Sequence, residues 1–430
     1  MLAALQLLLS KELILMENIS SNKKAATMAL IMGTLAMLVS FMAWSSISPL
    51  AKVFATDLHV NIGYQKVLVA IPVLLGSIMR LPMGILSDKF GGKKVYLFLM
   101  GFTLLPLIAT PLVINAAKSG LANTAAVAAP TSYYWLMIFV ALLLGMAGTS
   151  FAVSISYVSV WFPKEKQGQI LGITGMGNIG NAVAALLLPT IAGPTHNLST
   201  VYFFLVALTV VFMLIFAFTT TEMPTNKEKT VKEALSVAKN MDTWYLALFY
   251  MLTFGSFVAF GTLLPTLLSN PKTFNVALVS AGLLSAMFSA IATIIRPFGG
   301  TLADKIRPAT LLFWAFLGIL VSSVMLFFAA QGTGNLTLFI AAIVIEAIFA
   351  GLGNGIVFKM VPYVAKGNTG AVTGFVGAMG GLGGFFPPLV VAAFSNNLAM
   401  CFFFLGGFTV ICGIVLVAVY FRGNHHTVEE

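Results

Sequence analysis

Twelve stretches of this sequence are apolar over about the length that a bilayer crossing requires. A helix needs roughly 20 such residues to span the hydrocarbon core, and an open sheet cannot span it because its edge groups would stay unpaired. Only 8% of the 430 residues are charged, compared with about 25% in soluble domains. We therefore predict an all-α integral membrane protein with twelve transmembrane helices. The predicted spans are residues 28–51, 67–87, 95–115, 133–160, 168–193, 200–220, 244–268, 277–303, 309–329, 337–361, 370–394 and 399–421.

The long polar interruption at 221–243 divides these spans into two groups of six. It predicts a cytoplasmic linker between an N-terminal six-helix bundle at 28–220 and a C-terminal one at 244–421. Residues 1–27 are then a cytoplasmic lead, and 422–430 a cytoplasmic tail.

The basic residues are distributed unevenly between the connections. Most of the 23 lysines and arginines fall on the side that carries both termini, whereas Lys52, Lys66, Lys118 and Lys272 are assigned to the other side. Cytoplasmic connections carry such an excess, so both termini are predicted to be cytoplasmic in a cell-membrane protein. The same distribution explains the net charge of +10 without a nucleic-acid partner.

Two arginines lie inside predicted spans at matching places. The strings that begin at Arg80 and Arg296 align without a gap, and each reaches an aspartate, Asp88 or Asp304, eight residues later. Because an arginine near the bilayer centre costs roughly 2.5–3.5 kcal/mol, it is expected to be functional. The matching pair predicts one anion site between two halves.

The duplication extends to two glycine-rich segments in the fifth and eleventh spans. Two repeated six-span halves are typical of transporters that bind substrate near the midplane, and small residues let membrane helices approach closely. Ordinary helix packing would explain one stripe but not two duplicated stripes that include the polar Asn178, which we expect to bind the anion. The predicted gating glycines are Gly172, Gly175, Gly177, Gly180, Gly374, Gly377, Gly380 and Gly383.

A charged motif follows the second span and returns in a weaker form after the eighth. The stretch from Gly84 to Lys94 resembles the loop signature of the major facilitator superfamily, and Gly300 to Arg307 is the weaker copy. We predict that Asp88 and Asp304 act as a conformational latch by pairing with a cation or helix N-terminus of the other half. The alternative is a charged turn that only obeys the topology.

The segments 145–181 and 351–388 resemble the paired signature segments of the nitrate/nitrite porter family. The resemblance implies a twelve-helix major facilitator fold and secondary active transport of nitrate and nitrite. It also implies that the rings of Phe151 and Phe358 sandwich a planar anion, and that Tyr250 contacts the substrate.

The two arginines suit a planar anion, since a guanidinium stays charged and donates forked hydrogen bonds. An empty site with two positive charges would resist closure, which favours exchange of one anion for another. Proton symport is the other coupling mode, and Glu346 is the candidate proton site. Capping of Glu346 by hydroxyl groups near the outer interface is the alternative. We expect Lys359 to reach the cytoplasmic interface rather than the substrate.

Other classes of function find little support. Cys401 and Cys412 share the last span and are expected to be free core residues, with no metal or cofactor site. The loops are too short to hold a catalytic centre, so an enzyme is not expected. The alternatives are a porter of another small monovalent anion, such as a carboxylate, and a membrane sensor of nitrate. We expect a monomer, with Met16 as an alternative start of translation.

Overall fold

The computed structural model describes residues 2–122, 130–162, 167–222, 236–271, 273–332, 334–365, 369–394 and 397–421. Across these residues, twelve helices are long and apolar enough to cross a membrane, as the sequence predicts. The predicted linker lies largely outside the described residues, at 223–235, and the predicted tail, 422–430, lies wholly outside them.

Short 3-10 segments interrupt several helices of the N-terminal half, whereas in the C-terminal half a 3-10 segment, η5, precedes α12 and a π-helical segment, η6, ends the last span. The N-terminal half comprises α1 (Leu2–Trp44), η1 (Ser48–Leu50), α2 (Ala51–Asp57), α3 (Ile62–Ile78), α4 (Arg80–Phe90), α5 (Gly92–Leu121), α6 (Ser132–Leu144), η2 (Gly145–Thr149), α7 (Ser150–Ser159), α8 (Gln167–Gly175), η4 (Met176–Ile179), α9 (Gly180–Ala192) and α10 (Leu198–Thr219). The C-terminal half comprises η5 (Val237–Lys239), α12 (Met241–Leu268), α13 (Leu278–Leu302), α14 (Pro308–Ala329), α15 (Leu336–Ala365), α16 (Thr369–Ala393), α17 (Leu398–Leu416) and η6 (Val417–Phe421).

Two predicted spans differ in detail from the structure. The first runs to Asp57 rather than to residue 51, because α1, η1 and α2 follow one another. The second is divided at Met79, between α3 and α4, with φ −76° and ψ −6°. Pro82, in the first turn of α4, has no N–H to donate, and at a helix start this costs little because that N–H would lack a partner within the helix. The division places Arg80 at the first position of α4.

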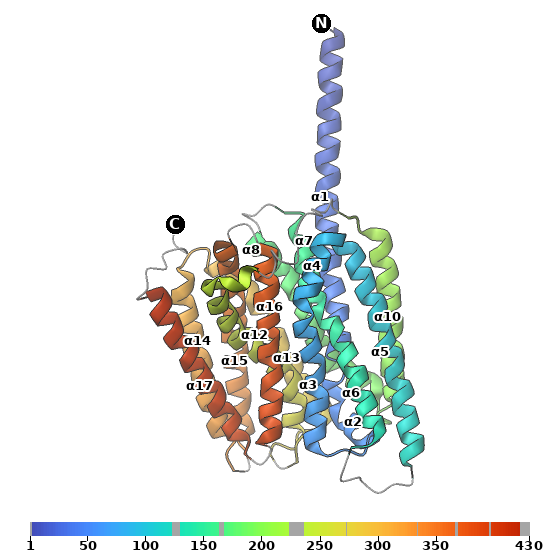
Figure 1. Ribbon diagram of the computed structural model, residues 1–430, viewed down its shortest axis with the longest axis vertical. Coiled ribbons are helices and arrows are strands. Elements are labelled where there is room, and N and C mark those ends of the chain that lie inside the picture. The colour runs from blue at the N-terminus through green and yellow to red at the C-terminus, as the bar shows by residue number, and fades with distance from the viewer. Residues whose placement is uncertain are drawn as a thin grey trace.

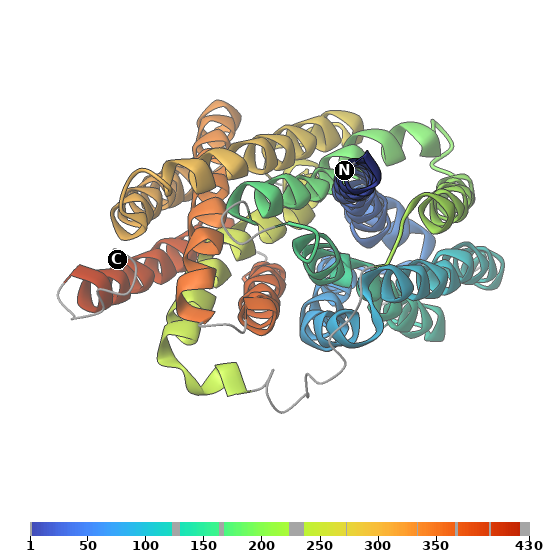
Figure 2. The same ribbon diagram turned by 90° about the horizontal axis from the view of Figure 1, so that it is seen from above.

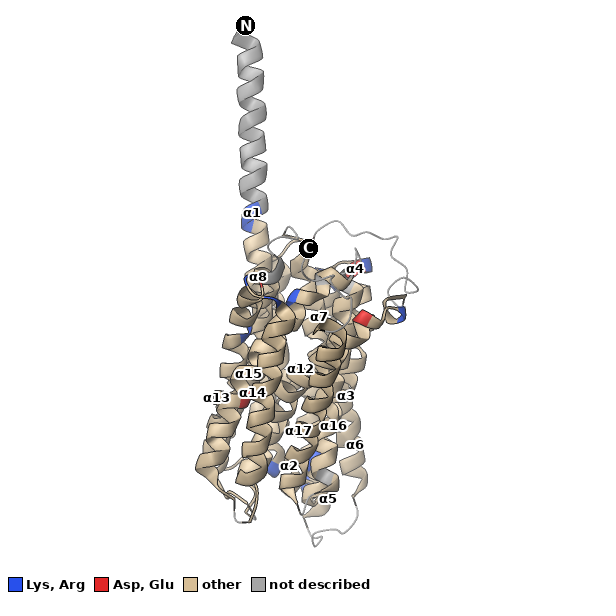
Figure 3. Cartoon of the chain, turned by 90° about the vertical axis from the view of Figure 1, so that its left-hand side faces the viewer, with Lys and Arg blue, Asp and Glu red and all other residues tan. Residues whose placement is uncertain are grey.

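The two halves stand side by side with their helices roughly parallel (Figures 1 and 2). The second and fifth spans of the first half meet the eleventh and eighth spans of the other. Thus α3 and α4 pack against α16, and α8 and α9 pack against α13. Figure 3 shows long stretches of helix without charged residues between the two ends of the molecule. The interface between the halves is therefore built from the duplicated segments.

The molecule has two distinct ends. We call the side where α1 begins and η6 ends the terminal side. The opposite side, where α2 and α16 end and α3 and α17 begin, is the distal side (Figure 1). On the distal side, hydrogen bonds join the halves. The hydroxyl of Ser48 donates to the carbonyl of Thr262 at 2.6 Å, and the ammonium of Lys66 donates to the carbonyl of Val391 at 3.1 Å. These bonds hold the halves together on that side.

Candidate functional site

The two predicted arginines meet at the interface between the halves. Arg80 begins α4 and is completely buried, and Arg296 lies in α13 with 3% of its surface exposed. Both guanidinium carbons face the ring of Phe151, at 5.1 Å for Arg80 and 5.3 Å for Arg296 from the ring centre. One ring thus lies against both cations, which fits the prediction of a single two-sided site.

Each guanidinium keeps part of its hydrogen-bonding capacity free. Arg80 donates from Nη1 to the carbonyl of Gly377 on α16, at 2.8 Å, and from Nε to the carbonyl of Gly148, at 3.4 Å. Arg296 donates from Nη2 to the hydroxyl of Tyr250 at 3.1 Å. Nη2 of Arg80 and Nη1 of Arg296 have no hydrogen-bond partner. A buried donor without a partner is costly, so these two nitrogens favour an added acceptor.

No carboxylate neutralises either arginine within the part of the chain that the structure describes. Their charges are met only by carbonyl oxygens, a hydroxyl group and aromatic rings. A buried charge is normally paired because leaving water without a counter-charge is expensive. Two such charges in one place form a site that can bind an anion.

Aromatic rings enclose this site. The predicted residues Phe151, Tyr250 and Phe358 all lie there. The guanidinium of Arg296 is 5.1 Å from the Phe358 ring centre and 5.9 Å from that of Tyr250. These distances are within the range of cation–π attraction. The structure thus brings five of the predicted substrate-binding residues together.

Phe254 belongs to the same cluster, although the sequence analysis did not select it. Its ring centre is 4.9 Å from the Arg80 guanidinium and 6.0 Å from that of Arg296. It also stacks on Tyr250, with ring centres 4.9 Å apart and planes at 11°. Residues four apart lie on the same face of a helix, so its spacing from Tyr250 on α12 is a signal that could have revealed it.

The phenylalanine pair differs in geometry from the predicted sandwich. Phe151 and Phe358 are in contact, with ring centres 5.6 Å apart and planes at 90°. Edge-to-face contact is a preferred arrangement for two rings with nothing between them. The two rings therefore do not form parallel walls in this structure, and a flat anion would enter only after they turn or separate.

Within each glycine segment, the first two predicted gating glycines face the opposite half. A Cβ atom added to Gly175 would lie 3.2 Å from Cζ of Arg296, and one added to Gly377 would lie 3.4 Å from Cε1 of Phe151. Gly172 faces Pro297 and Gly374 faces Leu81 in the same way. These glycines allow α8 and α16 to approach the site from opposite halves.

The last two glycines of each segment face a helix of their own half. An added Cβ at Gly180 would lie 2.2 Å from the carbonyl oxygen of Leu38, and one at Gly383 would lie 2.3 Å from that of Met251. Gly177 likewise packs against α1, and Gly380 packs against Tyr250 of α12. The eight glycines thus divide into four at the interface between the halves and four inside a bundle.

Three other predicted residues share no hydrogen bond or ion pair with the two arginines in the described part of the chain. Asn178, on η4, is 1% exposed, and its Oδ1 has no hydrogen-bond partner. Glu346, on α15, is fully buried, and the hydroxyl groups of Ser256 and Ser322 lie near its carboxyl group. Asp88 accepts a hydrogen bond from Ser156, on α7 of its own half.

Lys359 forms an ion pair with Asp304, which lies just after the end of α13 in the same half. Asp304 follows the terminal-side end of α13, so the Lys359 ammonium lies toward that side rather than at the paired arginines. The contacts of Asp88 and Asp304 described here remain within one half, so a latch between the halves stays a prediction.

The comparisons with known proteins agree with this architecture. Residues 33–388 match the sequence model of the Major Facilitator Superfamily. The chain belongs to this superfamily. A solved structure titled as a bacterial homologue of the human lysosomal transporter Spinster has a TM-score of 0.68 and 16% sequence identity, over 93% of this chain and 98% of that chain. This likeness shows the major facilitator fold.

Curated members of the superfamily are similar over most of the chain. A Staphylococcus epidermidis protein named "Probable nitrate transporter NarT" is 34% identical, over 92% of this chain and 97% of its own length. The "Nitrite extrusion protein" of Bacillus subtilis is 34% identical, over 92% of this chain and 95% of its own. This major facilitator protein is therefore a multi-pass membrane transporter rather than an enzyme.

Proposed function

We propose that this protein moves nitrate and nitrite across the cell membrane by alternating access. The observation that carries the proposal is the pair of buried guanidinium groups, Arg80 and Arg296, each with one unpartnered nitrogen. The names of the Staphylococcus and Bacillus relatives support nitrate and nitrite as the substrates.

The anion would bind between the two unpartnered nitrogens. Nη2 of Arg80 and Nη1 of Arg296 would donate to its oxygens. The Tyr250 hydroxyl accepts from Arg296, so its own proton is available for a third hydrogen bond. Once separated, the faces of Phe151 and Phe358 would favour a planar ion over a tetrahedral one.

Alternating access would proceed by rocking one half against the other around this site. We assign the distal side to the outside and both termini to the cytoplasm, so the bonds of Ser48 and Lys66 would close the outer side. The interface glycines would act as gating positions, and Asp88 and Asp304 would stabilise one of the two states as a latch. We expect one chain to suffice, because both cations of the site come from the same chain.

Vesicle uptake tests the function directly. Purified protein in lipid vesicles should accumulate labelled nitrate, and unlabelled nitrate or nitrite should compete for uptake. Formate and acetate at equal concentration should compete weakly. Strong competition by these carboxylates, with none by nitrite, would contradict the proposed substrate and favour a carboxylate porter.

For the coupling mode, we propose exchange of nitrate for nitrite. An empty site with two unneutralised guanidinium groups would resist closing around itself, so the return step would need a bound anion. We therefore expect internal nitrite to stimulate nitrate uptake, with little effect of an imposed pH gradient. Uptake that follows the pH gradient and ignores internal nitrite would instead demonstrate proton symport.

Glu346→Gln is expected to leave nitrate/nitrite exchange within about twofold of the wild-type rate. The amide nearly matches the carboxyl in shape, and the arginine contacts do not include Glu346. Exchange and pH-gradient-driven uptake should be measured for both proteins. If the wild type shows gradient-driven uptake that the variant selectively loses, Glu346 is a proton site and the exchange proposal is wrong.

A further inference from the structure

Lys66 is a buried cation that the transport site does not use. Its place at the edge of an apolar run predicts an outer connection, but Lys66 lies inside α3 with 3% of its surface exposed. It stands on the distal side, roughly 20 Å along the helices from Arg80. Its ammonium donates one hydrogen bond, to the carbonyl of Val391 on α16, at 3.1 Å. This bond joins the two halves of the molecule.

The position of Val391 explains why a lysine fits there. Val391 lies in the last turn of α16, which ends at Ala393. The last carbonyls of a helix lack partners within the helix and carry the negative end of its dipole. Lys66 therefore caps the C-terminus of α16 from the opposite half. The cap exists only while the distal ends of α3 and α16 are together.

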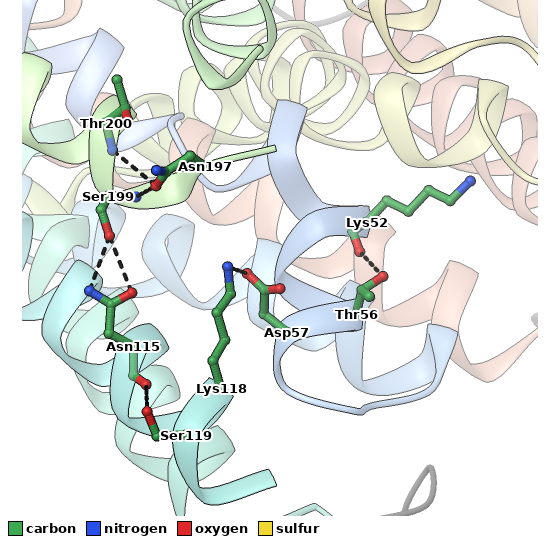
Figure 4. Close-up of polar contacts among 9 residues, drawn as sticks. All are labelled: Lys52, Thr56, Asp57, Asn115, Lys118, Ser119, Asn197, Ser199 and Thr200. Carbon is green, nitrogen blue, oxygen red and sulfur yellow. Dashed lines mark hydrogen bonds and ion pairs between the residues drawn. The ribbon is translucent and has the colours of Figure 1, made fainter. Parts of the chain in front are cut away.

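In the described part of the distal side, no carboxylate forms an ion pair with Lys66 in place of the Val391 carbonyl. Asp57 is the acidic residue there, and Lys118 pairs with it at 3.1 Å (Figure 4). Lys52, in α2, is exposed on the same side of the molecule (Figure 4). When α3 and α16 separate, Lys66 loses Val391 and gains no acidic partner. An ammonium in that position attracts anions.

We propose that Lys66 is a gate cation on the outer access path, which exchanges the Val391 carbonyl for the incoming anion when the distal side opens. This inference rests on the proposed function, because it needs an anionic substrate that approaches from that side. Lys66 would be a first anion contact ahead of the arginine pair. Lys66 would therefore contact anions that enter from the distal side, but not anions that enter from the terminal side.

Transport measured from each side separately tests this role. Lys66→Met should raise the KM for nitrate offered on the distal side by roughly tenfold, and leave the KM on the terminal side unchanged. Lys66→Arg should stay close to the wild type, because it keeps the charge. Lys52→Met is the matched control and should alter neither value. An unchanged distal KM in Lys66→Met, or an equal rise on both sides, would overturn the proposal.

A labelling experiment tests the gate without relying on transport. Ala70 is fully buried one helical turn from Lys66. With Ala70→Cys in a Cys401→Ser, Cys412→Ser background, this thiol should react several-fold faster with an impermeant maleimide on the distal side when Lys66→Met is added. The Lys52→Met control should not change the rate. Equal labelling rates with and without Lys66→Met would show that Lys66 does not close the distal side.

The two proposals fail differently. If the wild type does not transport nitrate, the proposed function is wrong, whereas the labelling result still reports on the gate. If the wild type transports nitrate but Lys66→Met matches it in both experiments, only the gate role is wrong.

Discussion

Arg80→Lys and Arg296→Lys are each expected to lower nitrate transport by roughly 100-fold. Hydrogen bonds that involve a charged group contribute about 1.5–3 kcal/mol, and each substitution removes at least one such bond to the anion. A lysine keeps the positive charge but loses the planar fork. The loss of transport should therefore be larger than the loss that moving a positive charge would cause by itself.

The contacts of Arg80 show why lysine cannot substitute. Its Nη1 and Nε are already bound to the carbonyls of Gly377 and Gly148, which leaves Nη2 for the substrate. These contacts fix the direction in which the free nitrogen points. A single ammonium would bind either the carbonyl oxygens or the anion in good geometry, but not both.

Initial rates of labelled nitrate uptake in vesicles should be compared at equal amounts of folded protein. Arg307→Lys is the matched control, because this arginine donates to the carbonyl of Tyr420, away from the paired-arginine site. It should transport at nearly the wild-type rate. Full uptake by either Arg80→Lys or Arg296→Lys would contradict the paired-arginine site.

Much of this site is predictable because its arginines are energetically unfavourable in apolar spans, and such residues are easily recognised in a sequence. An arginine within an apolar span is unfavourable wherever it lies, and the gap-free alignment of Arg80 with Arg296 places both at equivalent depths. Phe254 carries no such cost, since it is one of 36 phenylalanines in an apolar chain. Only its position four residues after Tyr250 distinguishes it. Apolar residues of a membrane site therefore escape sequence reasoning more easily than charged ones.

The number of spans was predictable for a similar reason, whereas the direction of each side chain was not. Hydropathy reports the length of a helix but not which neighbour it faces. The glycine segments can be recognised in the sequence, but their division between the interface and the bundle interior depends on how the helices pack. Lys66 illustrates the same limit, because a lysine at the edge of an apolar run can lie in a loop or cap a helix of the other half.

Alanine substitutions should separate the two classes of glycine. Gly180→Ala and Gly383→Ala are expected to lower protein stability by about 1–3 kcal/mol, the usual cost of overpacking. Their new methyl groups would meet backbone carbonyl oxygens of a neighbouring helix at 2.2 and 2.3 Å, and the backbone cannot move aside as a side chain can. Their unfolding temperatures in detergent should fall, and transport should decline with the amount of folded protein.

Gly175→Ala and Gly377→Ala should behave in the opposite way. Their methyl groups would lie 3.2 Å from the Arg296 guanidinium and 3.4 Å from the Phe151 ring, so small side-chain shifts can relieve the contact. Unfolding temperatures should stay close to the wild type, while the transport rate per folded molecule falls several-fold. The methyl groups reach moving parts of the opposite half, so they should hinder closure around the anion. If all four variants lost stability alike and kept the wild-type rate per folded molecule, these glycines would serve helix packing alone.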